Sequence, residues 1–315
     1  MTASSFGCSR WRHEKAWQGR WIRQLFRVKE GRIRVWGSLL ATAFWLLLFL
    51  GGGMAGQPES GVRLSWATNL LTFHDARLPG RKLEVWYLEA FLRPGAHDRD
   101  WNETRLTHHT ELLHATPDGQ ELRFRTRVEP SVVVLHEVRV EPDGLDLRFL
   151  LSNEGTNLVP VQWFQPACIR VAQFTGCGQS NYTRRSFVFT TKGRKTLDRI
   201  RRTGKARYLG GQVYLPPWTA EADANPRPIS PDRLGSGLIG CVSGDGKWIL
   251  ATASDQTHEL FEGVYVCLHS DPLVGGLKPG ESKRLRQKLY LVPNDPEDLV
   301  RRYRRDFPIQ SMTER

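Results

Sequence analysis

One carboxylate interrupts an apolar stretch of this chain. Glu89 lies between residues 83 and 91, where most of its neighbours are hydrophobic. A carboxylate in such a stretch needs a cationic or hydrogen-bonding partner, because burial without one is unfavourable. Arg93 or a histidine could supply that partner. The alternative for Glu89 is a structural ion pair, or a position facing solvent at the edge of a strand.

Histidines supply the other candidates for acid–base chemistry. His108 and His109 are adjacent, so on a strand they point to opposite faces, and only one of them can line a given site. His269 ends an apolar run and enters a loop, where an imidazole can exchange protons near neutral pH. A hydrogen-bonded loop residue is the equal alternative for His269. We expect Glu89, His109 and His269 to be the catalytic residues, with Glu89 and His269 as the titrating pair.

An aromatic ring and an amide are expected to contact a sugar. Trp163 and Gln165 share one face of a strand. The C–H groups of a sugar ring can stack on an indole while its hydroxyls bond to an amide, although Trp163 could equally belong to the core. With Arg93, these two residues are the expected substrate-binding residues, and the predicted ligand is a carbohydrate.

Motifs of several common site types do not occur in the sequence. GxSxG, GxxxxGK[ST], HExxH and CxxC are all missing, which argues against a serine nucleophile elbow, a phosphate loop, a zinc protease and a zinc ribbon. We therefore expect no metal site and no cofactor. Four cysteines follow the N-terminal region: Cys168, Cys177, Cys241 and Cys267. They could form two disulfides, in any of three pairings, or they could remain buried thiols.

Alternating polar and apolar residues predict the elements that must position these side chains. Residues 121–128 and 145–152 alternate with period two, which is typical of antiparallel strands with one wet face. Asp-Gly pairs at 118–119, 143–144 and 245–246 favour turns beside such runs. More than ten strands are expected, among them 83–92, 158–164 and 261–269. One helix is predicted over 296–305, with Asp295 as its cap and arginines at its end.

These patterns predict an all-β fold: a large antiparallel β-sandwich or supersandwich with one short C-terminal helix. A long connection without periodicity runs from Pro216 to Gly235 and contains five prolines. Connections of this length in compact domains are often functional, or else disordered.

The N-terminal region has the pattern of an export signal. Residues 1–34 are basic, residues 35–56 carry no charge and include an apolar centre, and small residues follow. We expect one exported domain over 57–315, either periplasmic, extracellular or anchored through residues 35–55, which are long enough for a membrane span. Cleavage and retention both remain open. A start at Val28 would give a signal of normal length and leave residues 1–27 untranslated.

The net charge does not indicate a nucleic-acid partner. The chain has 45 basic and 33 acidic residues, for a formal charge of +12, but residues 1–36 hold nine of the basic and two of the acidic groups. The remaining 36 basic and 31 acidic residues make the rest only mildly basic. We expect no nucleic-acid binding.

The chain resembles the galactose mutarotase (aldose 1-epimerase) superfamily. The similar segments are VCLH at 266–269, LKPGES at 277–282, KLYLV at 288–292 and LRFLLSNEG at 147–155 followed by VPV. The resemblance implies a supersandwich with a sugar-sized groove. His269 stands where the family has its catalytic glutamate, and Gln165 where its catalytic histidine would be sought. Since glutamine cannot transfer protons, the resemblance does not imply epimerase activity.

Three functions remain compatible with the sequence. The first is an exported carbohydrate-binding or carbohydrate-processing protein. The second is a polysaccharide lyase or hydrolase that uses Glu89, His109 and His269. The third is a non-catalytic structural or interaction protein of the cell envelope, which a retained membrane anchor and a filled groove would favour. An open cleft lined by Trp, Glu and His would favour the first two.

Overall fold

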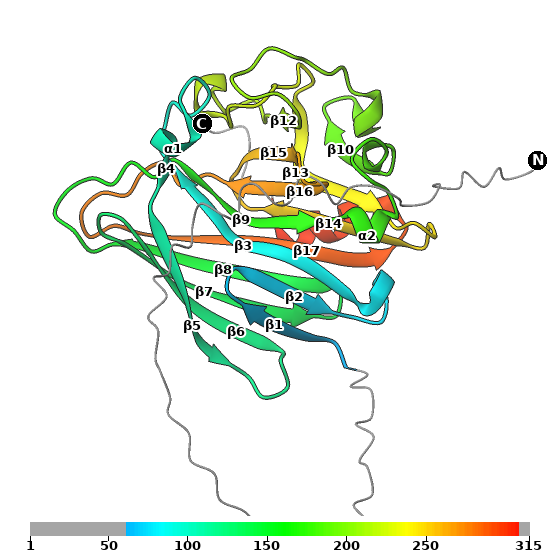
Figure 1. Cartoon of the computed structure of the whole chain (residues 1–315), viewed down its shortest axis with the longest axis horizontal. Coiled ribbons are helices and arrows are strands. Elements are labelled where there is room, and N and C mark those ends of the chain that lie inside the picture. The colour runs from blue at the N-terminus through cyan, green and yellow to red at the C-terminus, as the bar shows by residue number, and fades with distance from the viewer. Residues whose placement is uncertain (1–60, 309–315) are drawn as a thin grey trace, which may run out of the picture. The chain divides into compact units, whose positions relative to one another are not determined.

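The computed structural model describes residues 61–308, which form two antiparallel β-sheets (Figure 1). The first sheet has eight strands in the order β1-β2-β3-β9-β16-β15-β12, with β4 paired to β3. Their bounds are β1 (Arg63–Ala67), β2 (Leu70–His74), β3 (Lys82–Leu92), β4 (Arg105–Leu106), β9 (Trp163–Arg170), β12 (Gln212–Tyr214), β15 (Thr257–Gly263) and β16 (Cys267–Pro272).

The second sheet has nine strands in the order β11-β10-β13-β14-β17-β8-β7-β6-β5. Their bounds are β5 (His108–Ala115), β6 (Glu121–Val128), β7 (Val132–Glu141), β8 (Gly144–Asn153), β10 (Ser186–Thr190), β11 (Gly193–Thr196), β13 (Leu234–Val242), β14 (Trp248–Ser254) and β17 (Ser282–Pro293). The all-β sandwich that the sequence predicts is confirmed.

Alternation along the strands builds the core between the sheets. On β6, Leu122, Phe124 and Val128 are buried in the main hydrophobic cluster, while Arg123 and Arg127 are exposed. Each buried side chain of this size stabilises the fold by about 1.5–3 kcal/mol. The same cluster contains apolar residues of the first sheet, so the two sheets bury one face each against the other. The face of the first sheet that is turned away from the second sheet is called its outer face below.

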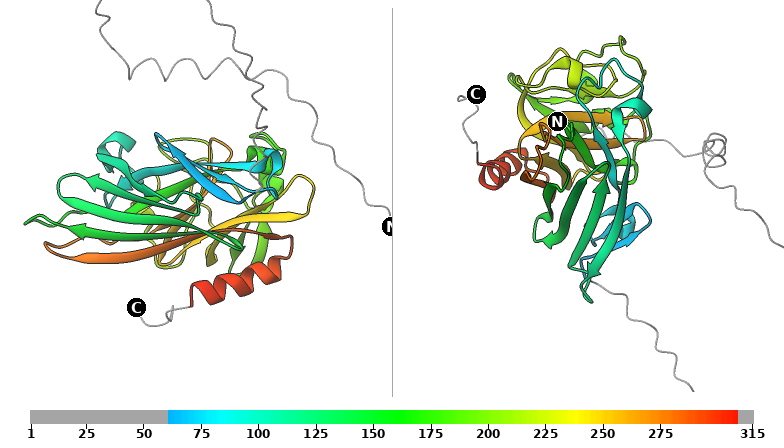
Figure 2. Two further views of the ribbon diagram at one scale, coloured as in Figure 1. Left: turned by 90° about the horizontal axis from the view of Figure 1, so that it is seen from below. Right: turned by 90° about the vertical axis from the view of Figure 1, so that its left-hand side faces the viewer.

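Helices are few and short. They are α1 (Trp101–Thr104), α2 (Ala172–Thr175), α3 (Pro296–Asp306) and the 3-10 turns η2 (Pro79–Arg81), η3 (Tyr182–Arg184), η4 (Leu197–Arg199) and η5 (Glu221–Asp223). The predicted C-terminal helix is confirmed as α3, and the carboxylate of Asp295 accepts hydrogen bonds from the backbone N–H groups of Glu297 and Asp298. Leu299 and Phe307 pack this helix on the side of the second sheet that faces away from the core (Figure 2).

The predicted Asp-Gly turns are present, but two strand boundaries were wrong. Gly119 and Gly246 adopt φ of 68° and 75° between paired strands, a conformation that glycine accepts without strain. The strand expected over 158–164 instead runs as β9, from Trp163 to Arg170. The run expected as one strand over 261–269 is two, since β15 and β16 are separated by a turn. Both errors fall where strands are buried on both faces and alternation disappears.

The long connection from Pro216 to Gly235 packs on β15. Trp218 donates its Nε1–H to the carbonyl oxygen of Thr257 at 3.1 Å. The hydroxyl of Thr219 donates to the backbone carbonyl oxygen of His258 at 2.6 Å. Further along, the backbone N–H of Asn225 donates to Oε2 of Glu259 at 2.9 Å. The connection therefore covers the β15 end of the outer face.

The expectations for the N-terminal region fall outside the described residues. They comprise the basic segment 1–34, the apolar segment 35–56 and the start at Val28. Within residues 61–308, no helix is both long enough and apolar enough to cross a membrane.

Candidate functional site

The imidazole of His269 lies at the centre of a buried polar cluster on the outer face. Cys267, His269 and Asp271 alternate along β16, so their side chains share this face, whereas Leu268 packs into the core. Nε2 of His269 lies 3.4 Å from Sγ of Cys267. Nδ1 lies 3.8 Å from Oδ1 of Asp271 and 3.8 Å from Oε2 of Glu89. The two ring nitrogens therefore face different chemistry, thiol on one side and carboxylates on the other.

A bulge in β3 brings Glu89 to this face. The pairing of β3 with β9 shifts register between Tyr87 and Ala90. Tyr87 and Leu88 both lie in the core cluster, so the next residue, Glu89, emerges on the opposite side. Its side chain is 33% exposed while its Oε2 atom is buried. Glu89 thus connects the buried cluster with solvent.

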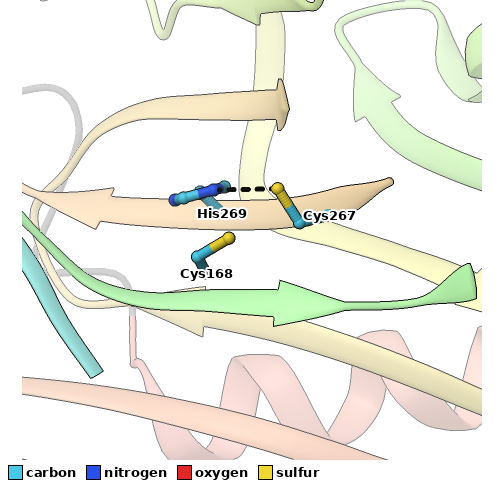
Figure 3. Close-up of side chains that lie close together, drawn as sticks. All are labelled: Cys168, Cys267 and His269. Carbon is cyan, nitrogen blue, oxygen red and sulfur yellow. Dashed lines mark hydrogen bonds between the residues drawn. The ribbon is translucent and has the colours of Figure 1, made fainter. Parts of the chain in front are cut away.

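Two cysteines from neighbouring strands complete the cluster. Cys168 on β9 and Cys267 on β16 are buried, and their sulfur atoms turn toward the ring of His269 (Figure 3). One ligand atom from each of these three residues lies within 4.8 Å of the others. Among residues 61–308, no disulfide joins any pair of cysteines. Of the alternatives that the sequence left open, the structure therefore has thiols at Cys168 and Cys267.

Polar side chains from β9 and β15 hold the carboxylates. Nε2 of Gln165 donates to Oδ2 of Asp271 at 3.0 Å. Glu259 lies directly across from Asp271 in the pairing of β15 with β16, and both side chains are fully buried. One oxygen of each carboxyl group has a hydrogen-bond donor, while Oε1 of Glu259 and Oδ1 of Asp271 have none among the described residues.

Burial and the neighbouring charges shift the pKa values in this cluster. Burial by itself opposes a charged imidazole, but the thiolate of Cys267 and the carboxylates of Asp271 and Glu89 outweigh it and raise the pKa of His269 to about 10. Donation from the Cys168 thiol, with the charge of His269, lowers the pKa of Cys267. Burial raises the pKa of Glu89 and of Asp271. The cluster favours an imidazolium–thiolate pair beside carboxyl groups that hold their protons more tightly than usual.

Several buried polar atoms of this face have no hydrogen-bond partner within residues 61–308. They are Glu89 Oε2, Arg170 Nε, Glu259 Oε1, His269 Nδ1 and Asp271 Oδ1. Leaving such an atom unpaired costs about 1–3 kcal/mol, so buried polar groups in folded proteins are nearly always paired. A concentration of unpaired atoms on one face is expected where a ligand, an ion or ordered water supplies the missing bonds.

Trp86 and Arg170 form the open part of the same face. Trp86 pairs with Cys168 across β3 and β9, so its side chain lies beside the cluster. The guanidinium carbon of Arg170 lies 5.6 Å from the centroid of the Trp86 ring, within the range of a cation–π contact. Trp86 is 41% exposed. An indole, a guanidinium and the carboxylate of Glu89 therefore lie together at the solvent boundary.

Trp163 does not offer an open platform. It is fully buried, it stacks on His258 with ring centroids 5.1 Å apart, and its Nε1–H donates to the carbonyl oxygen of Asp223 at 2.9 Å. Asp223 belongs to η5, within the connection that covers β15. Of the two alternatives for Trp163, the structure shows the core position.

Two of the expected site residues lie elsewhere. His109 is exposed on β5, at the edge of the second sheet, and pairs with Arg127. Its neighbour His108 turns inward and contacts the ring of Phe91. Arg93 is exposed just after the end of β3. His109 therefore does not belong to the cluster around Glu89 and His269. Gln165 contacts that cluster only through its hydrogen bond to Asp271.

Sequence reasoning missed Trp86, Cys168, Arg170, Cys267 and Asp271 as members of this site. Period two would have indicated part of it, because three side chains that can bind protons or metals alternate in Cys267-Leu268-His269-Ser270-Asp271. Two surface cavities of about 730 and 600 Å³ contain none of these residues, and the larger one borders Arg77 and Trp248.

Comparison with known proteins gives similarity at the level of structure. No protein-family model matches the chain, and no curated protein matches it. A galactose mutarotase-like protein from Lactobacillus casei ATCC 334 is 10% identical, with 73% of this chain and 100% of that chain covered and a TM-score of 0.39. The Slr1438 protein from Synechocystis sp. PCC 6803 is 11% identical, with 75% and 93% covered and a TM-score of 0.44.

A polysaccharide lyase is 13% identical over 73% of this chain and 32% of the lyase, with a TM-score of 0.35. Likeness at these scores is loose. The chain is similar to galactose mutarotase-like structures, the superfamily that its sequence motifs resemble.

Proposed function

We propose that this chain is an exported carbohydrate-binding protein whose ligand lies on the outer face, between Trp86 and Glu89. The observation that carries the proposal is the half-exposed indole of Trp86 beside three buried polar atoms without partners: Glu89 Oε2, Arg170 Nε and His269 Nδ1. An apolar ring beside unsatisfied donors and acceptors is the combination that a sugar complements.

The chemistry of each group fits a sugar. The C–H groups of a pyranose stack on an indole, which keeps its apolar face out of water. Its hydroxyls can donate to the carboxylate of Glu89 and accept from the guanidinium of Arg170, and bonds to charged groups are about twice as strong as neutral ones. The half-exposed position of Trp86 lets a ligand reach the ring without moving the connection that covers β15.

Export is part of the proposal and is supported by the sequence alone. A basic segment precedes an uncharged apolar stretch, and small residues follow it. A periplasmic reporter enzyme fused after residue 56 is expected to be active, whereas a reporter that works only in the cytoplasm is not. Activity of the cytoplasmic reporter would refute this part of the proposal.

Binding of the full chain to a glycan array, followed by titration of the best glycan, tests the ligand. Trp86→Ala is expected to weaken binding at least about fivefold, because stacking on an aromatic ring contributes about 1 kcal/mol or more. Trp218→Ala is the matched control, since Trp218 is 48% exposed and lies on the connection that covers β15. Equal affinity of both variants would refute the assignment of the site. Binding to no glycan would favour a structural protein of the cell envelope.

A polysaccharide lyase or hydrolase is the second candidate, and the place of Glu89 favours it. The carboxyl group reaches solvent and lies 3.8 Å from His269, so it could exchange a proton with a sugar on this face. Incubation with the bound polysaccharide would separate the candidates. New reducing ends that disappear with Glu89→Gln, while binding persists, would show catalysis. Unchanged polysaccharide would leave binding as the function.

A further inference from the structure

The three donors at the centre of the cluster match the ligand set of a metal. Cys168, Cys267 and His269 each present one ligand atom, and these atoms lie within 4.8 Å of one another. Thiolate and imidazole together are the ligands that zinc(II) and copper(I) prefer, whereas calcium and magnesium prefer oxygen. In a tetrahedral zinc site, bonds of about 2.0–2.3 Å place neighbouring ligand atoms about 3.3–3.8 Å apart. The 3.4 Å between Sγ of Cys267 and Nε2 of His269 is close to that spacing.

A glycine leaves room beside two of these donors. Gly263 on β15 lies directly across from Cys267. A Cβ atom at this position would lie 2.4 Å from Sγ of Cys267 and 3.5 Å from Nε2 of His269. Any side chain here would collide with the sulfur or fill the space next to the imidazole. The glycine therefore keeps the surroundings of both donor atoms open.

Carboxylates lie on the Nδ1 side of the His269 ring, as they do beside the histidines of many metal sites. A histidine that binds a metal through one nitrogen commonly directs the N–H of the other toward a carboxylate. Nδ1 of His269 faces Oε2 of Glu89 and Oδ1 of Asp271, each at 3.8 Å. Asp271 is in turn held by the amide of Gln165. The carboxylates thus lie on the Nδ1 side of the ring, at a separation that a bridging water spans, while Nε2 points to the thiols.

A disulfide between the two cysteines fits less well. Leu268 pairs with Ile169, so Cys168 lies opposite His269 and only diagonal to Cys267. Diagonal residues of antiparallel strands are about 7–8 Å apart between Cα atoms, whereas a disulfide needs about 4.4–6.8 Å. A metal bridges the same two sulfurs without pulling the strands together.

We propose that Cys168, Cys267 and His269 bind a zinc(II) ion through both sulfurs and Nε2, with a fourth position left for water or another ligand. Three protein ligands with an open position are the pattern of reactive rather than purely structural zinc sites. The bound ligands are two thiolates and a neutral imidazole, so binding releases two protons to solvent, one from the thiol of Cys168 and one from the imidazolium–thiolate pair of His269 and Cys267. The two proposed sites share His269, whose Nε2 faces the ion while its Nδ1 faces the sugar, but Trp86 and Arg170 take no part in holding the ion.

Metal content of the full chain tests the site. The protein is purified under reducing conditions, loaded with zinc(II), desalted and analysed by elemental mass spectrometry. About one zinc per chain is expected, falling at least fivefold in Cys267→Ala and Cys168→Ala. Cys241→Ala is the matched control, since Cys241 is also a buried thiol and lies outside the cluster. Trp86→Ala should retain zinc while its sugar affinity falls, which separates failure of the two proposals.

Cobalt(II) gives a readout that does not depend on the folding of a variant. Loading of the unaltered chain is expected to produce the thiolate-to-cobalt charge-transfer absorption and the intense visible bands of a tetrahedral site. Zinc should then displace cobalt and abolish both. Zinc that stays below about a tenth of an equivalent, cobalt without sulfur bands, or zinc retained in Cys267→Ala would each overturn the proposal. A Cys168–Cys267 disulfide in protein isolated without reductant that takes up no zinc after reduction would overturn it as well.

Discussion

Oε2 of Glu89 and Nδ1 of His269 lie 3.8 Å apart, and neither atom has a hydrogen-bond partner within residues 61–308. The separation is too long for a direct hydrogen bond. An oxygen atom about 2.8 Å from each would fit between them, so a water molecule or a ligand hydroxyl can bond to both at once. The pair is thus arranged around a third atom rather than around each other.

Replacing Glu89 by glutamine tests this arrangement. Glu89→Gln keeps the shape but removes the charge that a sugar hydroxyl would donate to, so we expect the dissociation constant of the best glycan to rise about tenfold in calorimetric titration. Glu137→Gln is the control, because Glu137 is partly exposed on β7 of the other sheet and pairs with Arg139. An affinity unchanged by Glu89→Gln would mean that the sugar does not reach this carboxylate.

Trp163 is expected to matter for stability and not for binding. Its indole is fully buried and packs between His258 and the connection that carries Asp223. Trp163→Ala removes a large buried ring and should lower the free energy of unfolding by about 3–5 kcal/mol in urea titrations followed by circular dichroism. Glycan affinity of the folded fraction should stay within about twofold. A folded variant that binds no glycan would instead place Trp163 in the ligand site.

Arg202 forms an ion pair with the buried carboxylate of Glu262 on β15. Arg202 donates two hydrogen bonds of 3.0 Å to the carboxylate of Glu262, which also accepts from the hydroxyl of Tyr214 at 3.1 Å. Arg202→Met would leave a carboxylate buried without its charge partner. We expect a loss of about 2 kcal/mol in the free energy of unfolding, less than for a fully buried pair because the Arg202 side chain is 45% exposed.

A double-mutant cycle isolates this pair. Adding Glu262→Met to Arg202→Met removes the buried charge, so the double variant should be more stable than the sum of the two single losses implies, by about 1 kcal/mol. Strict additivity would show that the two side chains do not interact in solution.

The sequence predicted the sheets better than the site. Alternation is visible where one face is wet, as on β6, and there the strand limits were right. β9 is buried on both faces, so apolar residues run together and its limits were misplaced. The same misplacement hid Cys168, because cysteine in an apolar run is indistinguishable from ordinary core. The proximity of Glu89 and His269 depends on a bulge in β3, which no sequence pattern announced.

The position of the long connection was also beyond sequence reasoning. Residues 216–235 have no periodicity, so their position could not be inferred, although their length marked them as unusual. Their contacts with Thr257, His258 and Glu259 hold them on β15, where the carbonyl oxygen of Asp223 accepts from the buried indole of Trp163. The chemistry of Trp163 could be inferred from its residue type, but its burial depends on residues 216–235, which are distant in the sequence.

Acid should destabilise this fold through His136, which is buried between the sheets. Its Nδ1 lies 2.6 Å from the hydroxyl of Tyr87 and its Nε2 lies 2.9 Å from that of Thr126, and the ring stacks on Phe124. Burial lowers the pKa of His136 to about 3. Between that value and the ordinary value near 6.5, the unfolded chain binds one proton more than the folded chain, so the free energy of unfolding falls as the pH falls.

The size of this effect can be measured against a variant that cannot titrate. Between pH 7 and pH 5, protonation of His136 in the unfolded chain should lower the free energy of unfolding by about 2 kcal/mol. His136→Asn keeps a polar group beside Tyr87 and Thr126, and although it is less stable at pH 7, its loss between the two pH values should be smaller by that amount. Urea titrations at pH 7, 6 and 5 give both slopes. Parallel slopes for the two proteins would show that His136 already takes up its proton in the folded state, and that solvent reaches a ring which the two sheets enclose.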